Sequence, residues 1–374
     1  MASGADSVPP TMRAVVLTGH GGPEKLVFES AWPVPELQAG EALVEVSACG
    51  MNNTDVNTRV GWYAKTAGPG AGAGAGAGAN EDGGWTAPIS FPRIQGADVC
   101  GRVAAVASDV SDGLLGQRVL VDPWLRDWDA PFDINRRGLL GSERDGGFAE
   151  YLAVPALNVH PVESTLSDIE LASFATASIT AANMVDRVGV AEGEDVLITG
   201  ASGGVGSALV QLTRGRGARA VAICGREKFD AVRGLGAAAV IARDEDDLQS
   251  ALKQSIDRAA VDVVLDVVGG PGWPVLIDVL RRGGRYCGSG AIAGPLVELD
   301  LRTLYLNDLV LHGATVPAPH LFGELVEAIE TGTLQPTVGA SFPLEQLHAA
   351  QEAFLAKHHV GNIVIDLRSR RAGA

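Results

Sequence analysis

The stretch that most constrains the fold is "DVLITGASGGVGSALVQL", residues 195–212. Its first five residues have the pattern of a buried parallel strand, and the chain then turns through four glycines into a helix predicted to begin near Ser207. Small residues are needed because the backbone must turn tightly and approach a pyrophosphate closely, while the helix N-terminus offers N–H groups to the negative charge. The pattern predicts a dinucleotide site. The residues predicted to bind the cofactor here are Gly200, Ser202, Gly203, Gly204, Val205 and Gly206.

The surrounding sequence favours this interpretation over an ordinary structural glycine turn. Apolar strands such as "RAVAIC" and "VDVVLDVVG" alternate with helical stretches from about residue 158 to 317. That alternation is typical of an α/β, doubly wound parallel sheet with helices on both faces. Val268 and Gly269, which follow one of these strands, and Thr180 from an earlier stretch are predicted to complete the cofactor site.

The end of the second strand indicates which nicotinamide cofactor is bound. An NAD site usually carries Asp or Glu there to bind the ribose 2′-hydroxyl. In "AICGREKFD", Gly225 and Arg226 come first and Lys228 stands at the next helix start, so two cations can pair with a 2′-phosphate. NADPH is therefore the expected cofactor, with NADH as the alternative. Glu227 lies past the tip and could point to solvent, and the two cations could be ordinary solvated charges.

A second, strand-rich domain is predicted from the remaining sequence. Residues 13 to about 157 contain short alternating or apolar runs broken by Gly, Pro and Asn, which indicate a barrel-like domain. After residue 317, two amphipathic helices and a closing strand are expected. The predicted domains are residues 1–157 with 318–374, and residues 158–317. The Gly/Ala-rich segment 68–84 is interpreted as a flexible surface insertion, with a mobile cover over the active site as the alternative.

Composition excludes several classes of protein. A net charge of −16 argues against general affinity for nucleic acid or anionic membrane, and no apolar run is long enough to span a bilayer. The N-terminus has neither the basic start nor the apolar stretch of a secretory signal. The four cysteines lie far apart without a C-x-x-C pair, which argues against a disulfide framework or a four-cysteine zinc lobe. A soluble protein of the reducing cytoplasm is expected.

Several motifs together resemble the medium-chain dehydrogenase/reductase superfamily, over residues 12 to 367. They are "GADVCGRVAAV" (96–106), "GGFAEYLAVP" (146–155), "GASGGVG" (200–206), "LDVVGG" (265–270) and "HVGNIVI" (359–365). Within that superfamily the chain is most similar to the quinone oxidoreductase and enoyl reductase branch. The resemblance implies a GroES-like catalytic domain beside a Rossmann nucleotide domain. The branch normally has Lys where this chain has Asn362, so no role is carried over to Asn362.

The same resemblance bears on zinc. The three ligand positions of the zinc-dependent members fall at Asn52, Ala97 and Thr176 in this chain. Asn and Thr offer only neutral oxygens and Ala offers no donor, whereas Zn²⁺ requires nitrogen, sulfur or carboxylate ligands. Cys49 and Asp98 remain as donors, but two donors without a histidine make a poor site. We therefore expect no catalytic metal, and we expect Cys49 to be a small buried hydrophobe.

The polar run after Cys49 supplies the candidate catalytic residues, again by resemblance. Asn52 is the family's usual replacement for the zinc cysteine and is expected to orient substrate or the cofactor's carboxamide. Thr54 matches the proton-relay position, and Asp55 is expected to anchor the loop. The pattern N-x-[ST]-D-x5-G-x-Y ends at Tyr63 and resembles that of thioester-type enoyl reductases, where the Tyr donates a proton. The alternative is that Tyr63 only lines the pocket.

These residues predict a zinc-independent, NADPH-dependent reductase of quinones or enones, acting on a small-molecule substrate. A ketone or imine reductase of a biosynthetic pathway, a zinc alcohol dehydrogenase and a non-catalytic NADPH-binding protein remain as alternatives. The apolar strand "DLVLHGATV" is expected at the edge of the nucleotide sheet. Because family members usually pair at that edge, the resemblance implies a homodimer.

Overall fold

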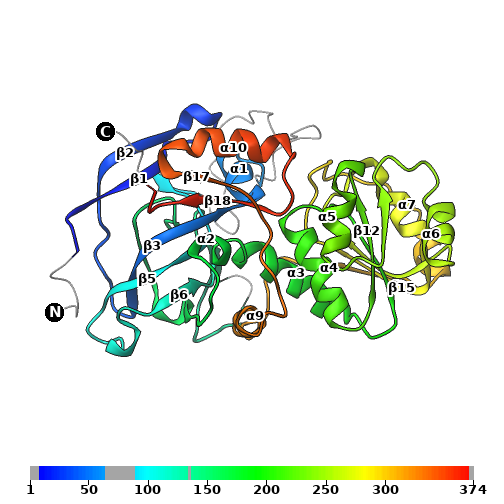
Figure 1. Cartoon of the computed structure of the whole chain (residues 1–374), viewed down its shortest axis with the longest axis horizontal. Helices are drawn as coiled ribbons and strands as arrows, with labels where there is room; N and C mark the ends of the chain where they lie inside the picture. The colour runs from blue at the N-terminus through cyan, green and yellow to red at the C-terminus, as the bar shows by residue number, and fades with distance from the viewer. Residues whose placement is uncertain (1–7, 64–88, 134–135, 370–374) are drawn as a thin grey trace. The chain divides into compact units, whose positions relative to one another are not determined.

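The protein is described by a computed structural model, which covers residues 8–63, 89–133 and 136–369 (Figure 1). The Gly/Ala-rich segment 68–84, interpreted above as an insertion or cover, lies outside the described residues. The chain divides into two compact units. Unit 1 comprises Met1–Thr176, Phe322–Glu330 and Pro336–Ala374, and unit 2 comprises Ala177–Leu321 and Thr331–Gln335.

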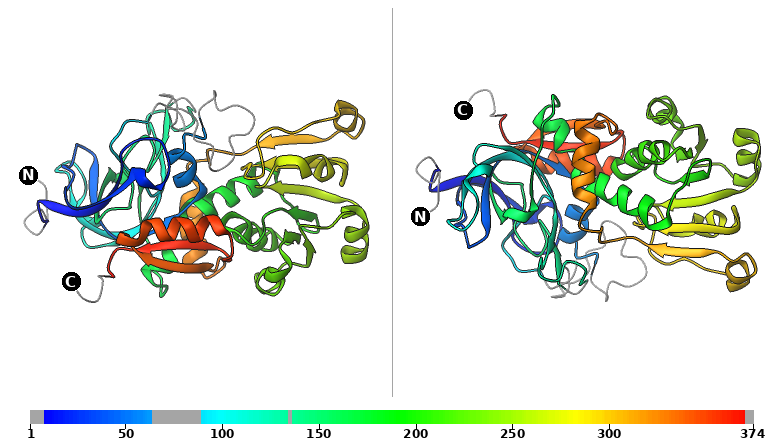
Figure 2. Two further views of the ribbon diagram at one scale, coloured as in Figure 1. Left: turned by 90° about the horizontal axis from the view of Figure 1, so that it is seen from above. Right: turned by 90° about the horizontal axis from the view of Figure 1, so that it is seen from below.

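Unit 2 is built on a six-stranded parallel sheet. Its strands are β11 (Asp195–Ile198), β12 (Arg219–Cys224), β13 (Ala239–Ala242), β14 (Val261–Asp266), β15 (Leu280–Gly288) and β16 (Val310–Gly313). They lie in the order β13-β12-β11-β14-β15-β16, and every neighbouring pair is parallel. This arrangement confirms the predicted doubly wound sheet. Figure 2 shows the strands side by side, with β16 at one edge.

Helices cover both faces of this sheet because successive strand side chains point to opposite sides. Val196 and Ile198 of β11 belong to the apolar core under α4, whereas Leu197 between them belongs to the core under α6 and α7. Figure 1 shows these two layers of helices. The helices of unit 2 are α3 (Ala175–Val188), which begins at the unit boundary, α4 (Gly204–Gly215), α5 (Phe229–Gly234), α6 (Leu248–Ile256), α7 (Trp273–Asp278) and α8 (Leu301–Leu306).

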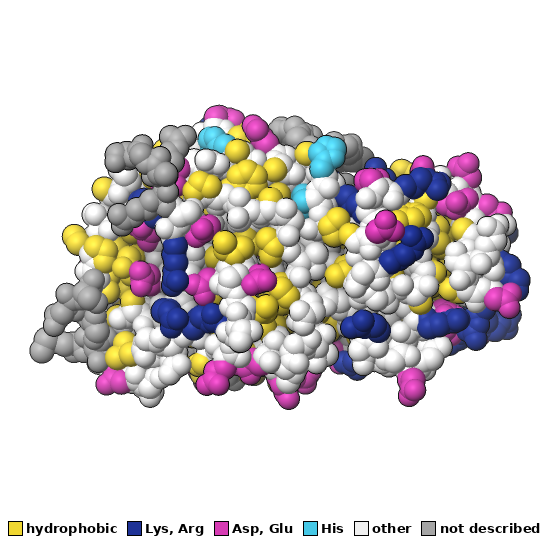
Figure 3. Space-filling view, in the orientation of Figure 1, with side chains coloured by type: hydrophobic (Ala, Val, Ile, Leu, Met, Phe, Trp, Pro, Cys, Tyr) yellow, Lys and Arg dark blue, Asp and Glu magenta, His cyan; other side chains and the backbone are white. Residues whose placement is uncertain are grey.

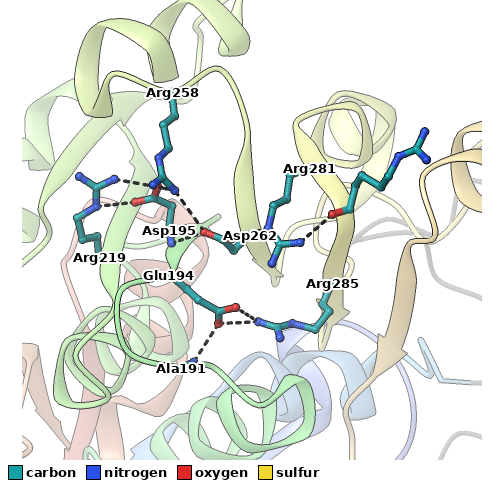
Figure 4. Close-up of polar contacts among 9 residues, drawn as sticks. Ala191, Glu194, Asp195, Arg219, Arg258, Asp262, Arg281 and Arg285 are labelled. Carbon is teal, nitrogen blue, oxygen red and sulfur yellow. Dashed lines mark hydrogen bonds and ion pairs between the residues drawn. The ribbon is translucent and has the colours of Figure 1, made fainter.

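Charged side chains join the strand starts at the amino edge of the sheet (Figure 4). The buried carboxylate of Asp195 accepts from Arg219 Nε at 2.6 Å and from Arg258 Nη1 at 3.0 Å. Asp262 of the neighbouring strand accepts from the backbone N–H of Asp195 at 2.8 Å and pairs with Arg281. The network therefore fixes the register of β11, β12 and β14 at the edge opposite to the predicted cofactor site.

Unit 1 is rich in strands, as the sequence predicts. A seven-stranded sheet has the order β10-β6-β5-β3-β18-β17 with β9 also pairing β3, and the smaller sheets are β2-β1-β4 and β7-β8. The strands are β1 (Thr11–Leu17), β2 (Leu26–Pro33), β3 (Glu41–Met51), β4 (Arg93–Ile94), β5 (Asp98–Val106), β6 (Arg118–Val121), β7 (Trp124–Arg126), β8 (Arg137–Leu139), β9 (Tyr151–Pro155), β10 (Val159–Pro161), β17 (Val338–Pro343) and β18 (Asn362–Asp366).

One apolar core unites these sheets, with Leu17, Met51 and Phe148 among its fully buried side chains. The helices of unit 1 are α1 (Asn53–Arg59), α2 (Asp168–Leu171), α9 (Leu321–Glu330) and α10 (Leu347–Ala356). The two amphipathic helices and the closing strand predicted after residue 317 are confirmed as α9, α10 and β18. The helix after the glycine turn begins at Gly204, three residues earlier than the sequence predicts.

The surface carries charges of both signs. On the face shown in Figure 3, acidic and basic side chains are interspersed. Within the described ranges, no helix combines the length and the apolar character needed to cross a bilayer.

Candidate functional site

In unit 2 the glycine turn has the geometry that a pyrophosphate requires. Gly200 adopts φ +58°, a left-handed conformation that favours glycine. A Cβ on Gly206 would lie 2.6 Å from Ala201 Cα, so only glycine lets the first turn of α4 pack on the preceding loop. The first N–H groups of α4 have no partner within the helix, and Ser202 to Val205 are only half-buried. These features fit a bound nicotinamide dinucleotide, whose phosphates would meet the helix N-terminus.

Charged side chains of both signs lie at the tip of β12. Gly225 is buried, and the exposed Arg226 pairs with the equally exposed Asp244, Nε to Oδ1, at 3.3 Å. Lys228 is largely buried, which lowers the pKa of its ammonium group. The carboxylate of Glu227 folds back against Gly225: its Oε2 lies 2.7 Å from where a Cβ of residue 225 would be. Glu227 follows the end of β12 and is exposed, as the sequence indicates, but its carboxylate lies beside Gly225 at the strand tip.

The loop after β14 lies at the same carboxyl edge of the sheet. Val268 and Gly269 are half-buried there, and Gly269 has φ +61°. Thr180 is half-buried on α3, whose apolar residues share a core with α4 and β11. The glycine turn and the loop after β14 are joined by a hydrogen bond from Thr199 Oγ1 to Asp266 Oδ1 at 2.5 Å. The structure therefore brings together the cofactor residues predicted after β11 and those predicted after β14.

In unit 1 the polar run forms the start of α1. Asn52 is the N-cap residue and is 8% exposed. Its backbone N–H donates to Asp55 Oδ2 at 2.7 Å, and Gly96 N–H donates to Asp55 Oδ1 at 3.2 Å. Asp55 therefore anchors the loop, as the sequence predicts. Burial raises the pKa of the Asp55 carboxyl to about 7, with the charge of Asp98 adding to the effect.

Thr54 and Tyr63 lie near the two ends of α1. The hydroxyl of Thr54 is shielded from solvent and has no hydrogen-bond partner among the described residues. The Tyr63 hydroxyl accepts from Asn57 Nδ2 at 3.3 Å, and its ring packs edge-on against Trp62 at 5.4 Å between centroids. Asn57, which the sequence argument left without a role, is thus a hydrogen-bond partner of the predicted proton donor.

A buried carboxyl lies among the three positions discussed for zinc. Asp98 Oδ1 accepts from Thr176 N–H at 2.8 Å, and the carboxyl also lies beside the Asn52 side chain. Burial raises the pKa of Asp98 to about 6, although hydrogen bonds from Thr176 and Asn52 oppose the shift. Ala97 is buried and offers no donor atom. Cys49 is a buried core residue, as predicted, and burial raises the pKa of its thiol well above the usual range.

Two family models match the chain, and both describe domains of dehydrogenases. Residues 38–164 match the alcohol dehydrogenase GroES-like domain, and residues 204–331 match the zinc-binding dehydrogenase family. The chain is 27% identical to the quinone oxidoreductase of Lama guanicoe over 349 residues, which covers 91% of this chain and 93% of that protein.

Solved structures agree with these matches. One from Sinorhizobium meliloti, assigned provisionally as an alcohol dehydrogenase, is 45% identical with a TM-score of 0.87 and covers 97% of this chain and 98% of that chain. The chain belongs to the medium-chain dehydrogenase/reductase superfamily. Another solved member, a 2-octenoyl-CoA carboxylase reductase in complex with NADP and 2-octenoyl-CoA, is 25% identical with a TM-score of 0.82 and covers 97% of this chain and 89% of that chain.

Superfamily membership makes the chain an oxidoreductase that uses a nicotinamide cofactor, NAD or NADP, on a small molecule. The zinc in the name of the matched family does not fit this chain's residues at the expected positions. Asn52, Ala97 and Thr176 supply no nitrogen, sulfur or carboxylate ligand. Among the described residues, no group of three or more His, Cys, Asp and Glu side chains lies close enough together to hold a metal ion.

Asn362, which replaces the usual Lys of this branch, has a structural contact that the sequence argument missed. Its Nδ2 donates to the carbonyl of Ser173 at 2.9 Å, although the two residues are 189 positions apart. Ser173 precedes Thr176, whose N–H holds Asp98. Asn362 therefore supports the segment that encloses the Asp98 carboxyl. No local sequence signal marks this contact, because it depends on how β18 and the segment before α3 meet.

The buried carboxyls generate a prediction about pH. Because the raised pKa values of Asp98 and Asp55 favour the neutral form in the folded state, these two carboxyls bind more protons in the folded protein than in the unfolded chain between about pH 4 and pH 7. Their contribution to the free energy of unfolding should then fall as pH rises through this window. For Asp98→Asn, we expect the free energy of unfolding to fall by roughly 1–3 kcal/mol less than in the wild type over the same pH range. Urea denaturation at pH 5 and pH 8 measures the difference.

Asp112→Asn, which removes an exposed carboxylate, is the matched control and should keep the pH dependence of the wild type. If Asp98→Asn keeps the pH dependence of the wild type, folding does not raise the pKa of the Asp98 carboxyl, and the prediction is wrong.

Proposed function

We propose that the chain is a zinc-independent, NADPH-dependent reductase of quinones or α,β-unsaturated carbonyl compounds. The observation that carries the proposal is the set of polar side chains Asn52, Thr54 and Tyr63 around α1, in a chain whose zinc-ligand positions include Ala97 and Thr176. The quinone oxidoreductase relative and the reductase solved with NADP and 2-octenoyl-CoA support it, because both align over nearly the whole chain.

The proposed mechanism divides the work between cofactor and protein. A nicotinamide cofactor, when bound, would supply the hydride that the substrate's β-carbon receives. A proton must also reach the substrate, and without a metal the developing negative charge must be met by hydrogen-bond donors. We assign that proton to the hydroxyl of Tyr63, which afterwards regains one from water. Asn57 Nδ2 donates to the same oxygen and would stabilise the phenolate that remains.

Thr54 and Asn52 would hold the substrate oxygen. The hydroxyl of Thr54 is without a partner within the described part of the chain, so it is available to donate to a carbonyl or to relay a proton. Asn52 is fixed by its place as the N-cap of α1, because its backbone N–H is held by Asp55. An amide in a fixed position can orient a carbonyl or the carboxamide of the cofactor.

Reduction of a panel of quinones, enones, enoyl thioesters and saturated ketones, with chelator present, tests the proposal. For Tyr63→Phe we expect kcat on enones or enoyl thioesters to fall about 100-fold, because a general acid contributes on that scale. Asn57→Ala should lose less, about three- to tenfold. Tyr151→Phe, a half-buried tyrosine on β9, is the matched control and should be unaffected. The rate is followed by nicotinamide absorbance.

Other outcomes would select other functions. Turnover of quinones alone, with Tyr63→Phe unaffected, would make Tyr63 a pocket wall. Turnover of ketones or imines alone would favour a carbonyl or imine reductase. Activity that returns only when zinc is added would refute zinc independence. Tight cofactor binding without any turnover would favour a non-catalytic NADPH-binding protein.

At the tip of β12, some side chains favour NADPH and others favour NADH. Arg226 and Lys228 lie at the tip of β12, where a cation can pair with a 2′-phosphate. Against this, Arg226 already pairs with Asp244, and the Glu227 carboxylate lies at the tip, where it would repel a phosphate or accept from a ribose hydroxyl. We favour NADPH because the ion pair of Arg226 with Asp244 is exposed on both sides, so a 2′-phosphate can compete for Arg226, and Lys228 adds a second cation.

Two variants separate these alternatives. Arg226→Ala should lower kcat/KM for NADPH about tenfold, the size of one charge-assisted contact, while NADH is nearly unaffected. Glu227→Gln should improve the use of NADPH, because it removes a negative charge beside the 2′-phosphate. Arg233→Ala, which changes an exposed arginine on the following helix α5, serves as the control. If wild type prefers NADH and Glu227→Gln loses that preference, Glu227 binds the ribose and the NADPH assignment is wrong.

A homodimer belongs to the same proposal. Strand β16 pairs only with β15 among the described strands, so its other edge can accept a strand from a second copy. Large apolar side chains are exposed on β16 and on the segment before it. They are Ile292, Leu296, Val297, Leu301, Tyr305, Leu306 and Val310. Exposed apolar side chains at an unpaired sheet edge are typical of a protein interface.

Light scattering after size exclusion tests the dimer. We expect wild type at twice the chain mass of 38.6 kDa, and Leu306→Glu at the monomer mass because a charge would be buried in the interface. Leu157→Glu, which changes a similarly exposed leucine in unit 1, should remain dimeric. A monomeric wild type, or a dimer that tolerates Leu306→Glu, would exclude this interface.

A reducing compartment such as the cytoplasm completes the proposal. Cys49, Cys100, Cys224 and Cys287 are all buried and free, as expected of a protein that keeps its thiols reduced.

A further inference from the structure

The point at which the strand order of unit 2 reverses lies between β11 and β14. From β11 the chain proceeds outward through β12 to β13, then crosses to β14 and continues to β16. In doubly wound sheets, ligands bind in the crevice outside the carboxyl ends of the strands at this reversal. The glycine turn 200–206 follows β11 and the loop 267–270 follows β14, so the two segments flank it.

One buried carboxylate crosses this point. Asp266 ends β14 and is fully buried. Its Oδ1 accepts from the hydroxyl of Thr199 at 2.5 Å, directly before the glycine turn. Its Oδ2 accepts from the hydroxyl of Tyr286 on β15 at 2.8 Å. The side chain therefore ties the carboxyl ends of three adjacent strands together.

The same carboxylate and its Thr199 partner hold the loop backbone. Val268 N–H donates to Asp266 Oδ1 at 2.9 Å, and Gly269 N–H donates to both carboxylate oxygens at 3.2 and 3.1 Å. The N–H of Val267 donates to Thr199 Oγ1 at 3.1 Å. Three successive backbone N–H groups of the loop are thus fixed by two side chains that lie at the strand ends.

The other side of the loop is fixed by the segment after β15. Ala293 N–H donates to the carbonyl of Val268 at 2.9 Å, and Gly270 N–H donates to the carbonyl of Gly294 at 3.0 Å. The loop is therefore held from both sides, and Asp266 is the group that sets its position relative to the glycine turn.

We propose that Asp266 is a positioning residue for the cofactor: through Thr199, Tyr286 and the N–H groups of Val268 and Gly269, it sets the loop 267–269 against the glycine turn. The inference rests on the proposed function only in that these loops bind a nicotinamide dinucleotide. Asp266 itself makes no contact with the cofactor, because its hydrogen-bonding capacity is used within the protein.

The substitution Asp266→Asn tests this role sharply. If the NH₂ group of an asparagine stands at the Oδ2 position, it faces Gly269 N–H, which keeps only its 3.2 Å contact with the remaining oxygen. If it stands at the Oδ1 position, it faces Val268 N–H, and the loop must move or leave that N–H unpaired. Tyr286→Phe removes a single hydroxyl from the network and should have a smaller effect. Asp262→Asn removes a carboxylate from the other end of the same strand and is the matched control.

The readouts are the dissociation constants of NADPH and NADH, from tryptophan fluorescence, and amide hydrogen exchange of residues 267–270 in the cofactor-free protein. For Asp266→Asn we expect about tenfold or more weaker binding of whichever cofactor wild type prefers, with faster exchange in the loop. Asp262→Asn should lower thermal stability but leave the dissociation constant within about twofold of wild type.

Two results would overturn the inference. One is an Asp266→Asn protein that binds the cofactor as tightly as wild type. The other is an equal loss of affinity in Asp262→Asn, because the effect would then reflect general destabilisation. Wild type that binds neither NADPH nor NADH would instead refute the proposed function, which separates the two failures.

Discussion

The close approach of α4 to the turn after β11 is the constraint on which the nucleotide unit depends. Gly206 has no room for a Cβ beside Ala201, so the helix starts at a fixed distance from the strand end. That position leaves the first N–H groups of α4 at the carboxyl edge of the sheet, where the strand order reverses. The charged network at the other edge, around Asp195, holds the strand starts and leaves the carboxyl edge for ligands.

Strand β14 carries one aspartate near its start and another at its end, and the two have different partners. Asp262 near its start accepts from a backbone N–H of β11 and pairs with arginines, so its carboxylate remains charged near solvent. Asp266 at its end has neutral hydroxyl and N–H donors. The interior residues Val263 to Leu265 are fully buried, as a strand covered on both faces requires. The two carboxylates therefore act at opposite edges of the sheet although they share a strand.

Local patterns made most of the fold predictable, because strand periodicity, glycine turns and amphipathic helices are properties of adjacent residues. The contacts that define the site depend on residues distant in sequence, and these were missed. Asp98 meets Thr176 across 78 positions, and Asn362 meets Ser173 across 189. The place of the Glu227 carboxylate was not predictable for another reason: an exposed side chain beside a glycine can fold back onto the strand tip, and no pattern encodes that rotamer.

The residues at the zinc-ligand positions determine how well the charge of the buried Asp98 carboxyl is compensated. A carboxylate removed from water is costly unless a cation or several donors compensate it. At Asp98 the compensating groups are neutral, from Thr176 and Asn52, and the pKa therefore rises to about 6. A divalent cation beside it would stabilise the charged form and shift the pKa in the opposite direction. Asn52, Ala97 and Thr176 bring no positive charge to Asp98, so its carboxyl can change protonation state near pH 6.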